Sequence, residues 1–217
     1  MVNGLQSTEP AGVVQATLLL AHGAGAPMDS DFMELLSNSL AGQGVRVLRF
    51  EFPYMAARRQ GAGKRPPNPM PILLDSFREH YGALANAGPL FIGGKSMGGR
   101  VASLLADELA PAGVICFGYP FHPPGKPERT RTDHLAGLAT PTLILQGTRD
   151  PFGKPDEVAG YALSRQIQVS WLESGDHDLK PLKRSGLSQA ELIDQAAQQA
   201  AAFMLGSDSS VGQRRQP

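Results

Sequence analysis

Short apolar runs alternate with longer amphipathic stretches along most of the chain, and this alternation limits the possible folds more than any other feature of the sequence. The runs are rich in Val, Ile and Leu, a pattern typical of strands buried on both faces. Six strands are expected, at Ala16–Ala21, Val45–Phe50, Leu90–Gly93, Val114–Phe117, Thr142–Gln146 and Ile167–Leu172. The sequence therefore predicts an α/β fold, a mostly parallel sheet with helices on both faces.

The stretches between these runs carry signals for helix ends. Asp31, followed three residues later by Glu34, predicts a capping box at the start of the first helix. Ser188 with Glu191 predicts another near the end of the chain. The remaining helices are expected over Ile72–Ala87, between Ser96 and Pro111, from Pro155 towards Leu163, and from Ser188 to Met204.

Three segments lack these patterns. Residues 1–15 are Gly-rich and polar, and residues 206–217 contain almost no apolar side chain, so both ends are expected to be frayed. Residues 53–71 combine several prolines with four basic residues and predict a long loop. We find no linker or internal repeat in the 217 residues, which predict one domain.

Charge and cysteine content narrow the classes of function. Twenty Lys and Arg balance twenty Asp and Glu, so binding to nucleic acid or to an anionic membrane through bulk charge is not expected. The single cysteine, Cys116, cannot form an internal disulfide, which favours a reducing compartment. The apolar stretch Val13–Ala21 is too short to span a bilayer and lacks the flanks of a signal peptide. We therefore expect a soluble, cytoplasmic protein.

Phosphate-binding and metal-binding signatures are missing from the sequence. It contains no Walker loop, no dinucleotide fingerprint with its downstream acid, and no cluster of metal ligands. No cofactor or metal is therefore expected, and the partner we expect is a small-molecule substrate.

The segment Gly94-Lys95-Ser96-Met97-Gly98 directly follows an expected strand and opens an expected helix. In that context a G-x-S-x-G pattern predicts a sharp turn that presents a nucleophilic serine, here Ser96. Glycines at both flanks suit the turn because larger side chains would collide with the neighbouring strand and helix. The alternative is a tight glycine turn with a solvated serine.

A serine nucleophile needs a histidine to accept its proton and a carboxylate to orient that histidine. Around a turn of this kind the partners commonly follow the serine along the chain in the order acid, then histidine, each after a strand. Asp150 and His177 fit this order. The rival acids are Asp176 and Asp178, which flank the histidine, and the rival bases are His22, His80, His122 and His134.

Acyl transfer also requires backbone N–H groups directed at the developing oxyanion. Met97, the residue after the nucleophile, is expected to supply one. The second is expected from the loop His22-Gly23-Ala24-Gly25 after the first strand, from Ala24 first and Gly25 next. The alternative for this loop is an ordinary glycine-rich strand exit.

Basic residues near the expected site have two interpretations. Lys95 either attracts an anionic acyl group or forms a structural ion pair. Arg58 and Arg59 either face the mouth of the pocket and bind acidic substrates or belong to a solvated loop. We retain Lys95, Arg58 and Arg59 as candidate substrate-binding residues.

Taken together, these motifs resemble the α/β-hydrolase superfamily. The segments Pro53-Tyr54-Met55, Gly93–Arg100, Gln146–Gly153 and Gly175–Leu179 are similar to those of a small dienelactone-hydrolase-like family. This family includes testis-expressed hydrolase-like proteins and the scaffold subunit of the NSL chromatin acetyltransferase complex. The resemblance covers about Ala16 to Met204 and implies a serine hydrolase fold with a complete triad. The connection Gly118–Thr140 is too short for a helical cap domain, which predicts an open site.

Two functions follow from this resemblance. The first is a serine hydrolase that cleaves an ester, thioester or lactone through an acyl-enzyme intermediate. The second is an interaction module that keeps the hydrolase fold with little or no catalysis, as the scaffold subunit suggests. The complete set of Ser96, Asp150 and His177 favours the first, because a scaffold has no physical need for them.

Overall fold

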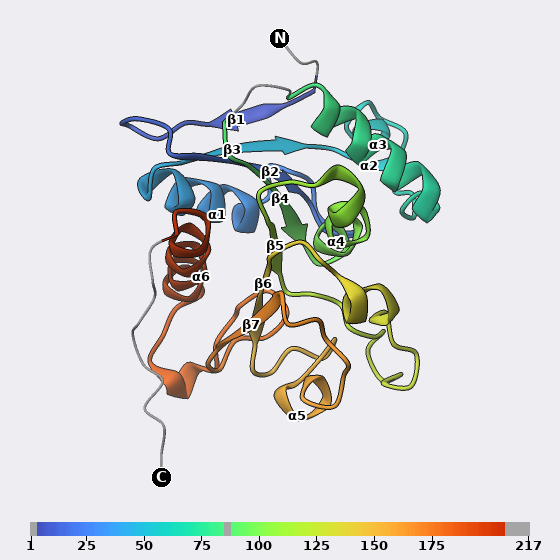
Figure 1. Ribbon diagram of the computed structural model, residues 1–217, viewed down its shortest axis with the longest axis vertical. Helices are drawn as coiled ribbons and strands as arrows, with labels where there is room; N and C mark the ends of the chain where they lie inside the picture. The colour runs from blue at the N-terminus through green and yellow to red at the C-terminus, as the bar shows by residue number, and fades with distance from the viewer. Residues whose placement is uncertain (1–3, 85–87, 207–217) are drawn as a thin grey trace.

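One seven-stranded sheet forms the centre of the protein, for which the computed structural model describes residues 4–84 and 88–206 (Figure 1). The strand order is β1-β3-β2-β4-β5-β6-β7, and all neighbours from β3 to β7 are parallel. The strands are β1 (Gln6–Thr8), β2 (Ala16–Ala21), β3 (Val45–Phe50), β4 (Leu90–Lys95), β5 (Val114–Phe117), β6 (Thr142–Gly147) and β7 (Ile167–Leu172). The six expected strands are confirmed, with β4 longer by two residues and β6 by one.

The seventh strand, β1, lies in a segment that we expected to be frayed, and for Gln6–Thr8 that expectation was wrong. The strand pairs antiparallel with β3, with Gln6 opposite Arg49. Its polar side chains explain why, since Arg49 donates to Thr8 Oγ1 at 3.1 Å and Gln6 Nε2 donates to Glu34 Oε1 at 3.1 Å. Residues 1–3 lie outside the described residues, as do 207–217 at the other end.

Helices cover both faces of the sheet, as expected (Figure 1). One face carries α1 (Asp31–Gly42) and α6 (Gln189–Met204), which pack against each other over one apolar cluster. The other carries α3 (Met70–Gly82) and α4 (Met97–Leu109) over a second cluster. Two short helices, α2 (Pro53–Arg59) and α5 (Pro155–Val158), join these elements. Both faces of the central strands are therefore buried, which explains their unbroken apolar sequences.

The expected loop over residues 53–71 contains a helix, so that prediction was wrong. Pro53 stands in the first turn of α2, where its missing N–H would have no helical partner in any case. The same helix buries Tyr54 and Met55 against the core. The α3 helix begins at Met70 rather than Ile72, and it ends at Gly82; residues 85–87 of its expected end lie outside the described residues. The α5 helix ends at Val158, well before Leu163.

The two expected capping boxes differ in outcome. Ser188 caps α6 by accepting the N–H of Glu191, whose carboxylate accepts the N–H of Ser188 in return, as predicted. The box at α1 was wrong, because Ser30 is the N-cap and makes no side-chain cap bond. Glu34 instead forms an ion pair with Arg49 at 2.7 Å. A buried guanidinium thus takes the carboxylate that the local sequence pattern assigns to the cap.

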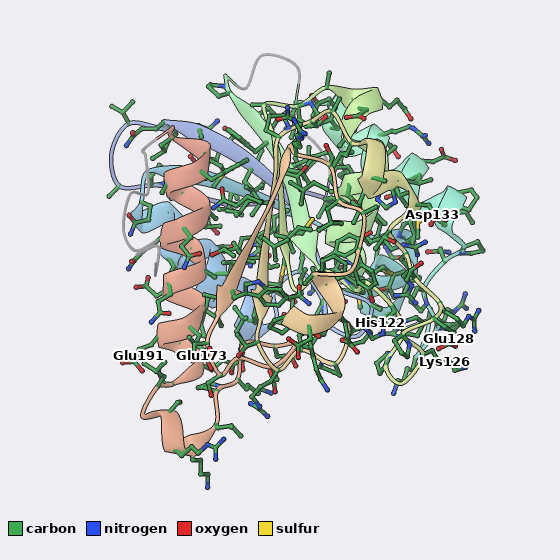
Figure 2. The ribbon with its side chains drawn as sticks, turned by 60° about the horizontal axis from the view of Figure 1, so that its bottom comes forward. His122, Lys126, Glu128, Asp133, Glu173 and Glu191 are labelled. Atoms are coloured by element: carbon green, nitrogen blue, oxygen red, sulfur yellow. The ribbon has the colours of Figure 1, made fainter. Side chains whose placement is uncertain are left out.

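The connection after β5 is short, as the sequence predicted, and contains only the 3-10 turn η1 (Asp133–Gly137) before β6. Its charged residues Lys126, Glu128 and Asp133 lie on the side of the molecule away from α6, where Glu191 is labelled (Figure 2). No cap domain covers the carboxyl edge of the sheet in the described part of the chain. None of the described helices combines the length and apolar character that crossing a membrane requires.

Candidate active site

Three residues from three loops meet at the carboxyl edge of the sheet. Ser96 follows β4, Asp150 follows β6 and His177 follows β7. His177 Nε2 lies 2.9 Å from Ser96 Oγ, and His177 Nδ1 lies 2.8 Å from Asp150 Oδ2. The structure therefore brings together the serine, base and acid expected from the sequence, in one continuous chain of hydrogen bonds.

The backbone at Ser96 is strained. Its φ of 52° and ψ of −112° lie outside the regions that L-residues normally occupy. Such conformations persist only where the surroundings impose them, and they cluster at functional sites. Here the surroundings are glycines: a Cβ at Gly98 would lie 2.5 Å from the carbonyl oxygen of Ala21, and one at Gly94 would lie 2.7 Å from the same atom. The glycines thus allow the turn to press against β2.

Asp150 is fully buried, and both of its carboxylate oxygens have hydrogen-bond partners. Its Oδ2 accepts a hydrogen bond from Gln146 Nε2 at 3.0 Å in addition to that from His177. Its Oδ1 accepts the backbone N–H of Phe152 at 2.8 Å. Donors to both oxygens fix the direction from which His177 is bound. The sequence reasoning missed Gln146 and Phe152, although both lie in the motif around Asp150.

The ring of His177 is held between an aromatic side chain and a glycine. The Phe152 ring lies 4.2 Å from it, centroid to centroid. On the Gly118 side, where φ is +69°, a Cβ would lie 3.3 Å from His177 Nδ1. The imidazole side chain remains 18% exposed, whereas that of Asp150 is fully buried. The site is therefore open to solvent at the histidine and closed at the acid.

The rival acids have other partners. Asp176 Oδ1 accepts the backbone N–H groups of Asp178 and Lys180, both at 2.9 Å, and so shapes the loop that carries His177. Asp178 pairs with Lys95 at 3.4 Å. Asp150 is thus the carboxylate at the imidazole, and its two rivals support the loop and the elbow.

The rival bases also have other partners. His22 is fully buried: its Nε2 accepts the N–H of Phe52 at 3.1 Å, and its Nδ1 donates to the carbonyl of Gly23 at 2.7 Å. Burial lowers the pKa of His22, which keeps the ring neutral. The other contacts are His80 Nδ1 to the Ser76 carbonyl, His122 Nδ1 to the Pro123 carbonyl, and His134 Nε2 to Ser103 Oγ.

The loop after β2 lies against the serine. A Cβ at Gly23 would lie 3.7 Å from Ser96 Cβ. The Tyr54 hydroxyl donates to the carbonyl of Ala24 at 2.9 Å and lies 3.3 Å from that of Gly23. In a trans peptide the N–H points opposite to the carbonyl, so these bonds turn the N–H groups of Ala24 and Gly25 away from Tyr54. Tyr54 is a further residue that the sequence reasoning missed, because its role depends on a contact 30 residues away.

The three basic candidates have separate environments. The Lys95 side chain is buried and forms the structural ion pair with Asp178, one of the two interpretations considered. Arg59 is half-exposed and binds both Asp29 and the largely buried carboxylate of Glu51. Arg58 lies over the Tyr54 ring at 5.4 Å and donates to the carbonyl of Arg65. Substrate binding by the two arginines stays a prediction.

The surface of residues 4–84 and 88–206 includes two hollows that lie away from the three residues. A surface hollow of about 420 Å³ is lined by Tyr54, Arg65 and the neighbouring prolines, and one of about 680 Å³ lies between residues 8–15 and the end of α1. Neither includes Ser96 or His177, in keeping with an open site. Within those residues no group of three or more His, Cys, Asp or Glu side chains is arranged to hold a metal ion.

The fold and this geometry together define the class of protein. Residues 14–205 match the model of the alpha/beta hydrolase domain family. Since the match spans most of the 217 residues, the chain belongs to that family. The narrower resemblance to testis-expressed hydrolase-like proteins and to the NSL scaffold subunit stays a prediction.

Several solved structures share the fold. An α/β serine hydrolase without a lid from Xanthomonas campestris superposes with a TM-score of 0.68 at 19% identity, covering 92% of this chain and 87% of its own. Dienelactone hydrolase from Anabaena variabilis gives 0.68 at 18% identity, covering 93% and 90%. Est1E from Butyrivibrio proteoclasticus, with ferulic acid bound, gives 0.69 at 15% identity, covering 93% and 95%. At these identities the likeness concerns the fold alone.

Proposed function

We propose that the protein is a serine hydrolase that cleaves an ester, thioester or lactone of a small molecule. The observation that carries this proposal is the chain of hydrogen bonds from Asp150 through His177 to Ser96, at 2.8 and 2.9 Å, on a strained turn. An adjacent base makes an otherwise weak serine hydroxyl nucleophilic. A buried carboxylate fixes the tautomer of that base and stabilises its charged form.

The reaction has two matched steps. Ser96 Oγ forms a bond to the substrate carbonyl carbon while its proton passes to His177 Nε2. The bond to the leaving oxygen or sulfur then breaks, and the leaving atom takes that proton, which leaves an acyl-enzyme. Water repeats the sequence: it loses a proton to His177, adds to the acyl carbon and displaces Ser96, which regains its proton.

Backbone N–H groups of Met97 and Ala24 stabilise the oxyanion in both steps of this proposal. Met97 begins α4, so its N–H belongs to the first turn, where the helix leaves N–H groups without helical partners. Tyr54 and His22 hold the carbonyl of Gly23, which directs the N–H of Ala24 away from them. Donors fixed in advance need no reorganisation when charge develops, which makes them effective.

The substrate class follows from the same features. The open edge without a cap, the short connection after β5 and the exposed face of His177 suit a small acyl group with a leaving group that extends into solvent. One of the similar structures is a dienelactone hydrolase, which supports lactones and esters over amides. An ester or lactone also has a better leaving group than an amide. Its cleavage therefore needs less stabilisation from a site that is open to solvent.

Turnover of a substrate panel tests the proposal. We expect the protein to hydrolyse short aryl esters, thioesters or lactones, and Ser96→Ala to reduce kcat by at least about 10⁴-fold with an unchanged circular dichroism spectrum. Hydrolysis that survives in Ser96→Ala would contradict the proposal. Absence of turnover across the panel, with no acyl-enzyme seen by mass spectrometry, would favour the interaction module instead.

A further inference from the structure

Lys95 occupies the position directly before the serine, and its side chain turns away from solvent. The residue ends β4, where it pairs with Phe117 of β5. Its side chain is only 9% exposed. The ammonium donates to the backbone carbonyl of His177 at 2.6 Å and lies 3.4 Å from Asp178 Oδ1. One cation therefore joins the strand that carries the serine to the loop that carries the histidine.

The groups around Lys95 balance its charge. Burial lowers the pKa of Lys95, and the carboxylates of Asp178, Asp150 and Asp176 raise it in return. The ammonium also lies over the Phe32 ring of α1, 5.4 Å from its centroid. A buried ammonium is strongly unfavourable unless it is paired and hydrogen-bonded. The hydrogen bond and the ion pair of Lys95 must therefore compensate for the large desolvation penalty of its buried ammonium.

The loop that Lys95 holds is itself strained. Ser174 and Leu179, on either side of His177, adopt φ values of 66° and 58°. Left-handed conformations are unfavourable for residues other than glycine. A loop of this kind keeps one conformation only if bonds from outside hold it. Arg149 and Gln189 bond other carbonyls of this loop from outside, and Lys95 bonds the carbonyl of His177 itself.

The same side chain also lies beside the loop after β2. A Cβ at Gly23 would lie 3.6 Å from Lys95 Cγ and 3.5 Å from the Lys95 carbonyl oxygen. The aliphatic part of Lys95 thus packs under the loop that carries the proposed oxyanion donor Ala24. Its charged end reaches the loop that carries His177. Lys95, which directly precedes the Ser96 turn, therefore contacts both the loop after β2 and the loop after β7.

We propose that Lys95 is a positioning residue, which holds the backbone of His177 in register with Ser96 and places a buried positive charge beside the Asp150–His177 pair. The inference rests on the proposed function only in treating His177 as the base. It replaces the substrate-binding interpretation, because an ammonium bound to His177 and Asp178 is not free to bind an anionic acyl group. Lys95 touches no reacting atom and acts through the histidine.

Two physical effects separate this role from simple support of the fold. The hydrogen bond places the imidazole, so its loss reduces kcat more than it changes KM. The charge disfavours a second positive charge on the imidazole, so removing it makes the ring easier to protonate. Replacing Asp178 by a neutral residue should instead make the ring harder to protonate, because it removes a negative charge that faces the same ammonium. A residue that only stabilised the fold would produce neither effect.

The direct test is a proton NMR titration of the His177 ring, which does not depend on turnover. The ring signal is assigned by its loss in His177→Gln. In Lys95→Met we expect the midpoint of the titration to rise by about one pH unit. In Asp178→Asn we expect it to fall, by less than about half a unit because Asp178 is 55% exposed. Lys183→Met, which removes an exposed lysine farther along the same connection, is the matched control and should leave the midpoint unchanged.

Kinetics provide the second readout. We expect Lys95→Met to lower kcat by about 30- to 100-fold with KM changed by less than threefold. Lys95→Gln keeps an N–H donor on a side chain one atom shorter and removes the charge, so it should recover part of the lost kcat while keeping the shifted midpoint. Thermal unfolding measures each variant's fold, and if Lys95→Met does not fold, Lys95→Gln and Asp178→Asn still provide both signs of the shift.

An unchanged midpoint in folded Lys95→Met or Lys95→Gln, together with kcat within about twofold of the wild type, would overturn the inference. So would midpoints that move in the same direction in the lysine and aspartate variants. A wild type that hydrolyses nothing would instead overturn the proposed function. In that case the titration still decides whether Lys95 acts on His177.

Discussion

The loop after β2 and the loop after β7 both bring a histidine to the same edge of the sheet, but the two histidines differ in burial and in hydrogen-bond partners. His22 is fully buried, and both of its ring nitrogens bond to backbone groups. His177 is partly exposed, and both of its nitrogens bond to side chains, those of Asp150 and Ser96. The first histidine fixes the path of the chain, whereas the second can exchange a proton.

The comparison shows that the partners of a histidine decide its role more than its position in the fold. A ring whose two nitrogens are both hydrogen-bonded to backbone groups must break one of these bonds before it can accept a proton. A ring between a carboxylate and a hydroxyl gains a stronger contact when it is protonated, because the carboxylate stabilises the imidazolium. The structural histidine still contributes to the site, since His22 holds the carbonyl of Gly23 beside Ser96.

The largest expected difference between the two loops is in turnover. His177→Ala should reduce kcat by at least about 10⁴-fold and leave the free energy of unfolding almost unchanged. His22→Ala should do the reverse: it leaves the N–H of Phe52 without its partner, which is unfavourable by about 1–3 kcal/mol, and should lower kcat by no more than about tenfold. Steady-state kinetics and urea unfolding of both variants measure this. Equal kinetic losses would remove the distinction between the two histidines.

Asp150→Asn tests the acid partner of His177. The substitution keeps the shape and removes the charge, so the imidazole loses the group that fixes its tautomer. We expect kcat to fall by about 10³- to 10⁴-fold. Asp176→Asn and Asp178→Asn serve as controls with much smaller effects, because their carboxylates bond elsewhere. An active Asp150→Asn beside an inactive control would assign the acid role to another residue.

Tyr54→Phe tests the support of the loop after β2. It removes the hydroxyl that binds the carbonyls of Gly23 and Ala24, and it keeps the ring in the core. A hydrogen bond of this kind contributes about 0.5–1.5 kcal/mol, so we expect kcat to fall by about threefold to tenfold with little change in KM. Measurement of kcat and KM separately checks this. A change confined to KM would place Tyr54 at the bound substrate instead.

Acid should affect the structural histidine through stability. Burial lowers the pKa of His22 below its usual value of 6.5. The unfolded chain therefore takes up a proton at this residue at a higher pH than the folded one does. The contribution of His22 to stability is fully present above about pH 6.5 and declines as the pH falls from there towards the lowered pKa. Urea unfolding at pH 7.5 and 5.5 should show this loss, and it should be smaller in His22→Ala.

Arg59 is expected to matter least. Its half-exposed guanidinium binds Asp29 and the largely buried carboxylate of Glu51, so we expect its loss to affect stability more than turnover. Arg59→Gln should leave kcat/KM almost unchanged for both carboxylate-bearing and neutral esters of equal size. A selective loss for the anionic esters, reduced by added salt, would show that the arginine faces the bound substrate after all.

The sequence predicted the parts of the molecule whose signals are local. Unbroken apolar runs defined the six central strands, because a strand buried on both faces needs nothing else to be recognisable. Ser96, Asp150 and His177 were expected to lie together because each follows such a strand, in the chain order that commonly accompanies a G-x-S-x-G turn, and the structure places them in contact.

The parts that were missed depend on contacts between distant segments. The strand Gln6–Thr8 forms because Arg49 and Glu34 bond its polar side chains. Helix α2 was mistaken for a loop because prolines were interpreted only as breakers, although proline in the first turn of a helix favours its start. The bond of Lys95 to His177 joins residues 82 positions apart, and no local pattern indicates it.

Covalent labelling with a fluorophosphonate probe tests the central claim most directly, because only an activated serine beside a working base reacts with it. We predict a single adduct on the intact protein, mapped by peptide mass spectrometry to Ser96, with labelling abolished in Ser96→Ala, strongly slowed in His177→Ala and largely retained by the folded fraction of His22→Ala. No adduct under conditions that label a control esterase, or an adduct on another residue, would contradict the account.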